Sequence, residues 1–193
     1  MEKRKILVVV DCQNDFITGS LGTKEAQAIV PNVVEKIKNH FGWVIATQDT
    51  HFRDYLLTQE GKNLPIKHCI KGTEGWQIHP EIMKAIELHY GDYTVKPKFT
   101  FGKIQNLISF DFVGNDGFNY TCVPDDGDIE SIEIIGLCTD ICVISNALIL
   151  KAQYPETKII VDAACCAGVT PATHRAALEV MKMCQIEIIN DTE

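Results

Sequence analysis

The sequence lacks the long apolar runs, the basic charge and the low-complexity segments that mark several large classes of protein. Its first apolar run, Ile6–Val10, is too short for a signal peptide or a bilayer-spanning helix, so we expect a buried first strand. The net charge of -8 argues against binding to nucleic-acid phosphates and to anionic membrane surfaces. No internal repeat or Pro/Ser-rich linker divides the chain, so one domain over residues 1–193 is expected.

The eight cysteines contain no CxxC pair, and disulfide scaffolds are usually short secreted chains. We therefore expect most of them to be reduced, small apolar fillers in a cytoplasmic protein. The adjacent Cys165 and Cys166 could form a metal or redox pair, although packing beside a strand is the simpler interpretation. A redox sensor built on these thiols is a further alternative, and it predicts reversible disulfides.

Short apolar runs alternate with stretches of helical apolar spacing. The expected strands are Ile6–Val10, Trp43–Thr47, Tyr93–Val95, Ile132–Ile135, Lys158–Val161 and Ile186–Ile189. The expected helices are Ala26–Phe41, Pro80–His89, Asp140–Tyr154 and Pro171–Met183. Because several strands are continuously apolar, the pattern predicts an α/β fold with a mainly parallel sheet of about six strands and right-handed crossovers. The irregular stretch 110–128 is either a hairpin or an excursion over the surface.

Polar residues follow several of the expected strands, and ligands of open α/β sheets bind beyond these carboxyl ends. They are Asp11, Asp49 with His51, Lys96 and Cys142. Cys142 falls in the first turn of a helix, where the dipole favours a thiolate. Asp11 could take the thiol proton while Lys96 keeps that carboxylate oriented and ionised. The alternatives are an inert buried cysteine, a turn-capping aspartate and a solvated lysine.

Asp49, His51 and His68 have the composition of a divalent-metal site. The Asp-x-His spacing places both side chains on one side of an extended segment. Glu60 lies between the two histidines in sequence and could be a fourth ligand, the alternative being a solvated glutamate. The other histidines lack this context and are expected to be surface or capping residues: His40, His79, His89 and His174.

Five segments together resemble the isochorismatase-like cysteine hydrolases, and within them the nicotinamidases. They are residues 8–16 (VVVDCQNDF), 47–51 (TQDTH), 67–75 (KHCIKGTEG), 95–100 (VKPKFT) and 136–143 (GLCTDICV). The resemblance extends over nearly the whole chain. It implies a Rossmann-like, three-layer α/β/α fold.

The resemblance also implies a catalytic triad of Asp11, Lys96 and Cys142. The register favours Lys96 over Lys98, because Lys98 falls where the family often has an arginine before an aromatic and a hydroxyl residue. The implied reaction is hydrolysis of nicotinamide to nicotinate and ammonia through a thioester on Cys142.

Further site features are implied in the same way. The family's cis peptide would fall at Leu137–Cys138, and the backbone N–H groups of Cys138 and Cys142 would face the oxyanion. Phe16 would stack near the substrate ring, with Trp76 as a second candidate.

The family's metal, often zinc, would be held by Asp49, His51 and His68, and the ring nitrogen of nicotinamide would bind it. The expected partner is a small-molecule amide, with neither nucleic acid nor membrane involved. Assembly into a homo-oligomer is expected, since the family often forms dimers or larger assemblies.

Two departures from the nicotinamidase pattern bear on the substrate. Thr50 stands where nicotinamidases typically have tryptophan, and the stretch 101–128 does not follow their pattern. One alternative is therefore a related cysteine hydrolase that acts on another small amide, such as a ureido or carbamoyl compound. An alternative of another class is a non-catalytic α/β domain that binds a metal or another ligand.

Overall fold

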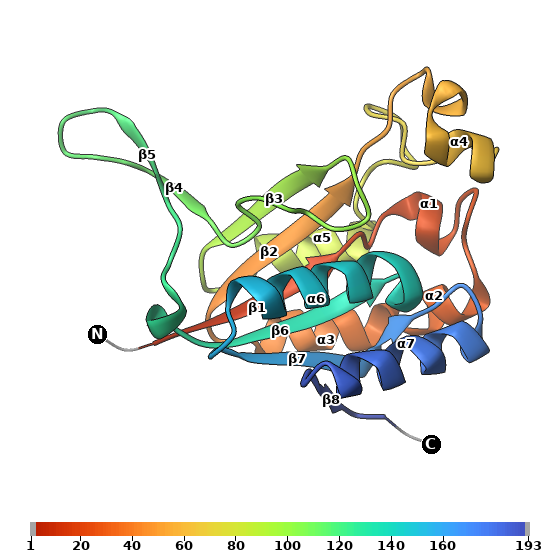
Figure 1. Cartoon of the computed structure of the whole chain (residues 1–193). Helices are drawn as coiled ribbons and strands as arrows, with labels where there is room; N and C mark the ends of the chain where they lie inside the picture. Colours follow the sequence, from red (N-terminus) through yellow and green to blue (C-terminus); the bar gives the residue numbers. More distant parts are fainter. Residues whose placement is uncertain (1–2, 192–193) are drawn as a thin grey trace.

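The computed structural model describes residues 3–191, apart from the side chain of Phe112, and is built around a six-stranded sheet (Figure 1). Neighbouring strands of this sheet run parallel. In spatial order they are β3 (Tyr93–Lys98), β2 (Trp43–Asp49), β1 (Arg4–Val10), β6 (Ile129–Leu137), β7 (Lys158–Ala167) and β8 (Glu187–Ile189). The predicted parallel α/β sheet is confirmed.

The central strand β1 is apolar and buried from Ile6 to Val10 because both of its faces are covered there. Val8 and Val10 point into one hydrophobic core, whereas Leu7 and Val9 point into the other. This is the alternation expected of a strand with a side-chain period of two. The sheet therefore separates two cores, as in other parallel sheets that are buried on both sides.

Helices cover the two faces of the sheet, which gives the predicted three layers (Figure 1). One face is covered by α3 (Val30–Asn39) and α5 (Pro80–Glu87). The other is covered by α6 (Ile144–Gln153) and α7 (Pro171–Met183), with the π-helical turn η3 (Thr139–Val143) leading into α6.

Short elements complete the chain around this framework. The predicted helix Ala26–Phe41 is divided at Ile29 into α2 (Lys24–Ala28) and α3. The remaining elements are α1 (Asn14–Ile17), η1 (Tyr55–Leu57), α4 (Gln59–Asn63), β4 (Phe110–Val113), β5 (Asn119–Cys122) and η2 (Asp126–Asp128). The irregular stretch contains the antiparallel hairpin β4–β5, which projects away from the main sheet (Figure 1).

Strand order reverses at β1, and this reversal determines where a ligand can bind. The chain passes from β1 outward to β2 and β3, then returns to the other side of β1 as β6. Ligands of open α/β sheets bind at such a switch point, beyond the carboxyl ends of the strands. The ends of β1, β2, β3 and β6 therefore define the candidate site. Among the described residues, the structure contains no helix long and apolar enough to cross a membrane.

Candidate active site

Side chains from three strand ends meet at this edge of the sheet. Asp11 directly follows β1, Lys98 is the last residue of β3, and Cys142 lies in the turn after β6. Lys98 Nζ lies 2.7 Å from Asp11 Oδ2 and 3.4 Å from Cys142 Sγ. All three residues are buried, with exposed fractions of 0%, 1% and 5% for Asp11, Lys98 and Cys142. The expected meeting of an aspartate, a lysine and a cysteine is found, but with a different lysine.

Lys96, the lysine predicted to hold Asp11, has other partners. Its Nζ donates to the backbone oxygen of Ser109 at 2.6 Å and to that of Asn106 at 2.9 Å. These contacts tie Lys96 to the segment that precedes β4. The predicted contact between Lys96 and Asp11 is therefore wrong, and Lys98 lies beside Asp11 instead.

The length of β3 explains this difference. The expected strand ended at Val95, which left Lys96 as the first residue beyond it. In the structure β3 continues in register with β2, pairing Gln48 with Pro97 and Asp49 with Lys98. An outer strand tolerates proline because one of its edges needs no hydrogen bond, and β3 is an outer strand.

Burial determines the protonation behaviour of the three groups. It raises the pKa of Asp11 even though the Lys98 ammonium opposes the rise. It also raises the pKa of the Cys142 thiol well above its ordinary value, and the Asp11 carboxylate adds to that rise. For Lys98 burial acts in the opposite sense, but the charge of Asp11 outweighs it and raises the pKa. The resting site thus pairs a protonated thiol with a carboxylate of increased proton affinity, which suits a general base.

Cys142 sits in an unusual turn. The π-helical turn η3 begins with Cys138 as its cap, and the Cys138 carbonyl accepts from the N–H groups of Ile141 at 3.1 Å and Val143 at 3.0 Å. The peptide bond Leu137–Cys138 is cis, at the position implied by the resemblance. This turn brings Cys138 and Cys142 to the wall of one cavity.

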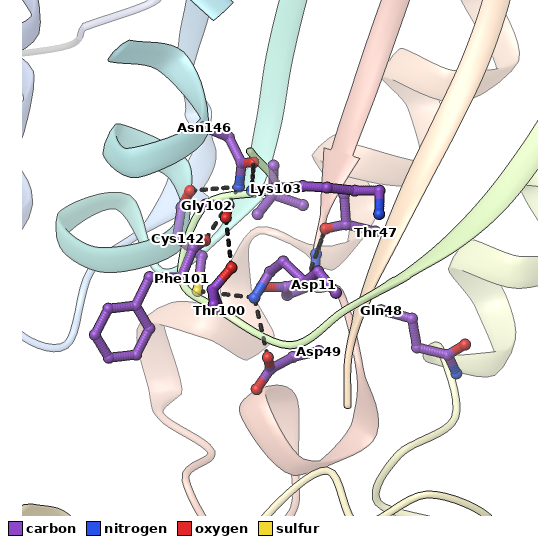
Figure 2. A network of polar contacts seen from close by, with 12 residues as sticks. Asp11, Thr47, Gln48, Asp49, Thr100, Phe101, Gly102, Lys103, Cys142 and Asn146 are labelled. Carbon is purple, nitrogen blue, oxygen red and sulfur yellow. Dashed lines mark hydrogen bonds and ion pairs between the residues drawn. The ribbon is translucent and has the colours of Figure 1, made fainter. Parts of the chain in front are cut away.

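Asn146, one helical turn after Cys142, fastens this helix to the segment that follows β3 (Figure 2). Its Nδ2 donates to the Cys142 carbonyl at 2.7 Å, and its Oδ1 accepts from the Lys103 N–H at 2.9 Å. Asn146 is fully buried. The segment that carries Lys98 is thereby fixed relative to the helix that carries Cys142.

A second polar cluster adjoins the first through Asp49. Asp49 Oδ1 lies 3.0 Å from Lys98 Nζ, and its Oδ2 lies 3.0 Å from His51 Nε2. Burial opposes ionisation of this carboxyl, but the neighbouring His51 imidazole and the charge of Lys98 hold its pKa below the usual range. Asp49 therefore stays ionised and joins the two clusters.

Asp49, His51 and His68 offer ligand atoms that all lie within 4.8 Å of one another. All three residues are buried. Glu60 faces the same space, since its Oε1 lies 3.4 Å from His51 Nε2 and 3.7 Å from His68 Nε2. Two imidazoles and one or two carboxylates form the donor set of zinc and related divalent metals.

Two observations indicate that these residues fit a metal. His51 Nε2 is buried and makes no hydrogen bond of good geometry, although the Asp49 and Glu60 carboxylates lie 3.0 Å and 3.4 Å away. His68 Nδ1 lies 2.9 Å from the Ile66 carbonyl oxygen, which leaves its Nε2 directed at the cluster, as in many metal sites. Although burial lowers the pKa of His51, Asp49 and Glu60 raise it to about 9, which reflects how much negative charge faces this ring.

Each cluster reaches one cavity of about 670 Å³ through some of its members. Cys142, Asp49 and His68 line it, and much of the remaining wall is apolar. Phe16 lines the cavity, with its ring 5.5 Å from that of His68. A volume of this size lies within the usual range of small-molecule sites.

Trp76, the second candidate for stacking on a substrate, is engaged elsewhere. Its Nε1 donates to Thr50 Oγ1 at 2.9 Å, and its carbonyl accepts from the side chains of Gln13 and Gln48. These bonds hold Trp76 and Thr50 against each other. The structure thus does not bring Trp76 into the wall of the cavity, because its indole is used in support of Thr50.

Sequence reasoning missed two supporting residues. Gln13 is fully buried, and its side chain bonds both the N–H of Asp49 at 2.7 Å and the carbonyl of Asp49 at 2.9 Å. Thr47 Oγ1 donates to Asp11 Oδ1 at 2.7 Å (Figure 2). Both lie in segments that carry the family resemblance, but Thr47 is a residue typical of strands and Gln13 is uncharged and follows a strand end. Neither carried a signal that could have revealed its role.

Several known proteins with similar sequences are named nicotinamidases. The nicotinamidase/pyrazinamidase of Mycobacterium tuberculosis is 29% identical over 196 residues, which cover 96% of this chain and 98% of that protein. The nicotinamidase/pyrazinamidase of Bacillus subtilis has a crystal structure that matches with a TM-score of 0.74 at 21% identity and covers 96% of this chain and 98% of its own.

A further solved structure is the pyrazinamidase of Pyrococcus horikoshii in complex with zinc. It matches with a TM-score of 0.66 at 23% identity and covers 96% of this chain and 98% of its own. The sequence pattern of the isochorismatase domain matches residues 5–193, nearly the whole chain. The protein belongs to the isochorismatase domain family.

Proposed function

We propose that the protein is a metal-dependent cysteine amidohydrolase of the nicotinamidase type, which converts nicotinamide and water to nicotinate and ammonia. The single observation that carries this proposal is the shared cavity. The buried Asp11–Lys98–Cys142 set reaches its wall through Cys142. The Asp49–His51–His68 set reaches it through Asp49 and His68, and the Asp49 carboxylate joins the two sets. The names of similar proteins support the same substrate class.

The reaction begins with transfer of the Cys142 thiol proton to Asp11. Burial has raised the proton affinity of the Asp11 carboxylate, and Lys98 Nζ at 2.7 Å keeps this carboxylate oriented. The sulfur then attacks the amide carbonyl carbon, whose oxygen becomes an oxyanion. We assign the backbone N–H groups of Cys138 and Cys142 to its stabilisation, where each such donor is worth about 3–4 kcal/mol in measured cases.

Collapse of this intermediate breaks the C–N bond. Asp11 returns its proton to the leaving nitrogen, ammonia departs, and a thioester remains on Cys142. Asp11 then accepts a proton from water, which attacks the thioester carbonyl. Carboxylic acid is released as the proton passes from Asp11 back to the sulfur, so that the resting thiol is regenerated.

Asp49, His51 and His68 would hold a divalent metal, with zinc the proposed ion and Glu60 a proposed further ligand. When bound, such an ion supplies Lewis acidity and a fixed point of orientation for a nitrogen or oxygen ligand. Phe16 would lie along the substrate ring, given its place on the cavity wall.

The test is ammonia release from a small panel of amides that includes nicotinamide, pyrazinamide and an N-carbamoyl amino acid. Protein as purified, with its metal content measured, is compared with protein treated with a chelator and then reloaded with zinc. The proposal predicts the highest kcat/KM with a pyridine or pyrazine carboxamide, loss on chelation and recovery on reloading. A preference for the N-carbamoyl compound would move the protein to the alternative substrate class.

Two further properties remain predictions. A cytoplasmic location is in keeping with cysteines that are free throughout the described residues. Homo-oligomeric assembly is expected by analogy with the family.

A further inference from the structure

The turn that carries Cys142 is held from outside the cavity by helix α7. Thr139, the first residue of the turn η3, is fully buried. Its Oγ1 lies 2.8 Å from Nδ1 of His174, and the two atoms share a hydrogen bond. His174 was expected from the sequence to be an ordinary surface or capping residue, but it is half-buried and reaches the nucleophile turn.

A second contact joins the same two regions. The Asp140 carboxylate accepts from the Val169 N–H, at 3.1 Å and 3.2 Å for its two oxygens. The neighbouring Gly168 packs directly on His174, because a Cβ added to this glycine would lie 2.9 Å from His174 Cβ. Gly168 and Val169 line the cavity. The loop before α7 thus serves both as cavity wall and as a support for the turn.

The position of Thr139 gives its hydrogen bond a chemical consequence. Thr139 lies directly between Cys138 and Asp140 in the turn whose backbone N–H groups are assigned to the oxyanion. The Cys138 carbonyl accepts from both Ile141 and Val143, so hydrogen bonds tie Cys138 to the residues on either side of Cys142. A shift of the Thr139 side chain would therefore displace the Cys138 N–H and the Cys142 sulfur together.

We propose that His174 is a positioning residue for the reaction and acts through Thr139 to fix the nucleophile turn. The inference rests on the proposed function for its catalytic readout. His174 itself does not line the cavity described above, so its effect falls on the alignment of reacting groups and leaves substrate contacts in place. Misplacement of a reacting group by about 1 Å can cost on the order of 100-fold in rate.

The test compares variants on each side of the hydrogen bond. Thr139→Val keeps the shape of the side chain and removes its hydroxyl, whereas Thr139→Ser keeps the hydroxyl. His174→Phe keeps a ring and removes its nitrogens, whereas His174→Asn retains a polar atom near the place of Nδ1. Glu179→Gln, on the exposed surface of α7, is the matched control. For each we would measure kcat, KM, thermal midpoint and the rate of Cys142 alkylation by iodoacetamide.

His174→Phe and Thr139→Val should each lower kcat about tenfold or more with KM within about twofold of the parent, since alignment and not binding is lost. Their double variant should lose no more than the larger single loss, because both break one interaction. Thr139→Ser and His174→Asn should recover most of kcat relative to the two disruptive variants. The Glu179→Gln variant should match the parent.

A parent-like kcat in His174→Phe, or fully multiplicative losses in the double variant, would overturn the proposal. If Thr139→Val does not fold, the His174→Phe and His174→Asn pair decides alone. The alkylation rate, measured with the exposed Cys122 and Cys184 replaced by serine, separates this proposal from the proposed function. If the parent hydrolyses no amide, a change of several-fold in Cys142 labelling in His174→Phe supports the positioning role, and an unchanged rate refutes it.

Discussion

Lys98 Nζ lies 2.7 Å from Asp11 Oδ2, and this ion pair links the end of the outer strand β3 to the end of the central strand β1. Neither side chain has access to solvent. A buried carboxylate without a cation would be neutralised, so Lys98 keeps Asp11 available as a base. The same ammonium lies 3.0 Å from Asp49, which makes Lys98 the common partner of both carboxylates.

Lys98→Met should lower kcat by about 100-fold or more, because the Asp11 carboxylate loses the charge that orients it. Lys96→Met is the matched control, since the Lys96 ammonium donates to the backbone oxygens of Asn106 and Ser109 and to the Ser109 hydroxyl. We expect its kcat to stay within severalfold of the parent. Steady-state ammonia release measures both variants. The reverse order of effects would restore Lys96 as the catalytic lysine.

Cys142→Ala should abolish amide hydrolysis while the fold is retained, as measured by ammonia release and circular dichroism. Turnover within severalfold of the parent would remove Cys142 from the nucleophile role. Alkylation gives a second measurement. Burial raises the pKa of the Cys142 thiol, whereas Cys122 and Cys184 are exposed cysteines. Labelling should therefore be followed at Cys142 by mass spectrometry after both exposed cysteines are changed to serine.

Metal affinity should rise with pH. The His51 pKa of about 9 in the metal-free protein means that this ring is protonated at neutral pH, and a metal must displace that proton. The apparent association constant should therefore increase by up to about tenfold per pH unit between about pH 6.5 and pH 8.5, and flatten above the pKa. Competition with a chelator of known affinity measures it. A pH-independent constant in this range would contradict the protonation assigned to His51.

His51→Ala should lose most of the bound metal, since it removes one of two imidazole ligands. Elemental analysis of the purified variant beside the parent gives the stoichiometry. His89→Ala is a matched control, because His89 bonds the Gly42 carbonyl far from the cluster in sequence. Equal metal content in the parent and the His51 variant would exclude His51 as a ligand, and a metal-free parent would exclude the site.

Gly136→Ala should destabilise the fold by about 3 kcal/mol or more. Gly136 has a φ of 116°, and an added Cβ would lie 2.1 Å from the Val10 carbonyl oxygen. The close approach of β6 to β1 at this point places η3 beside Asp11. Gly127→Ala is the control, because an added Cβ there meets nothing within 4 Å. Urea unfolding compares them, and equal midpoints would refute the steric argument.

Much of the fold could be predicted because its signals are local. Apolar runs such as Ile6–Val10 and the helical spacing of Pro171–Met183 depend only on neighbouring residues, and both elements occur where expected. The points at which helices are interrupted were predicted less accurately. The helix expected over Ala26–Phe41 is interrupted at Ile29, since backbone geometry at a junction depends on packing as well as on propensity.

The sequence by itself determined which residue types stand after the strands: Asp11 after the first, Asp49 and His51 after the second, and Cys142 in the turn after β6. Only the tertiary structure decided which lysine meets them. Lys96 and Lys98 are two residues apart and point to the same side of β3, so side-chain period cannot distinguish them. The choice depends on the outer position of β3, where Pro97 does not interrupt pairing and the strand continues to Lys98.

The tertiary structure likewise decided that Trp76 supports Thr50 and that His174 reaches Thr139, because contacts across 26 and 35 residues of sequence leave no local pattern.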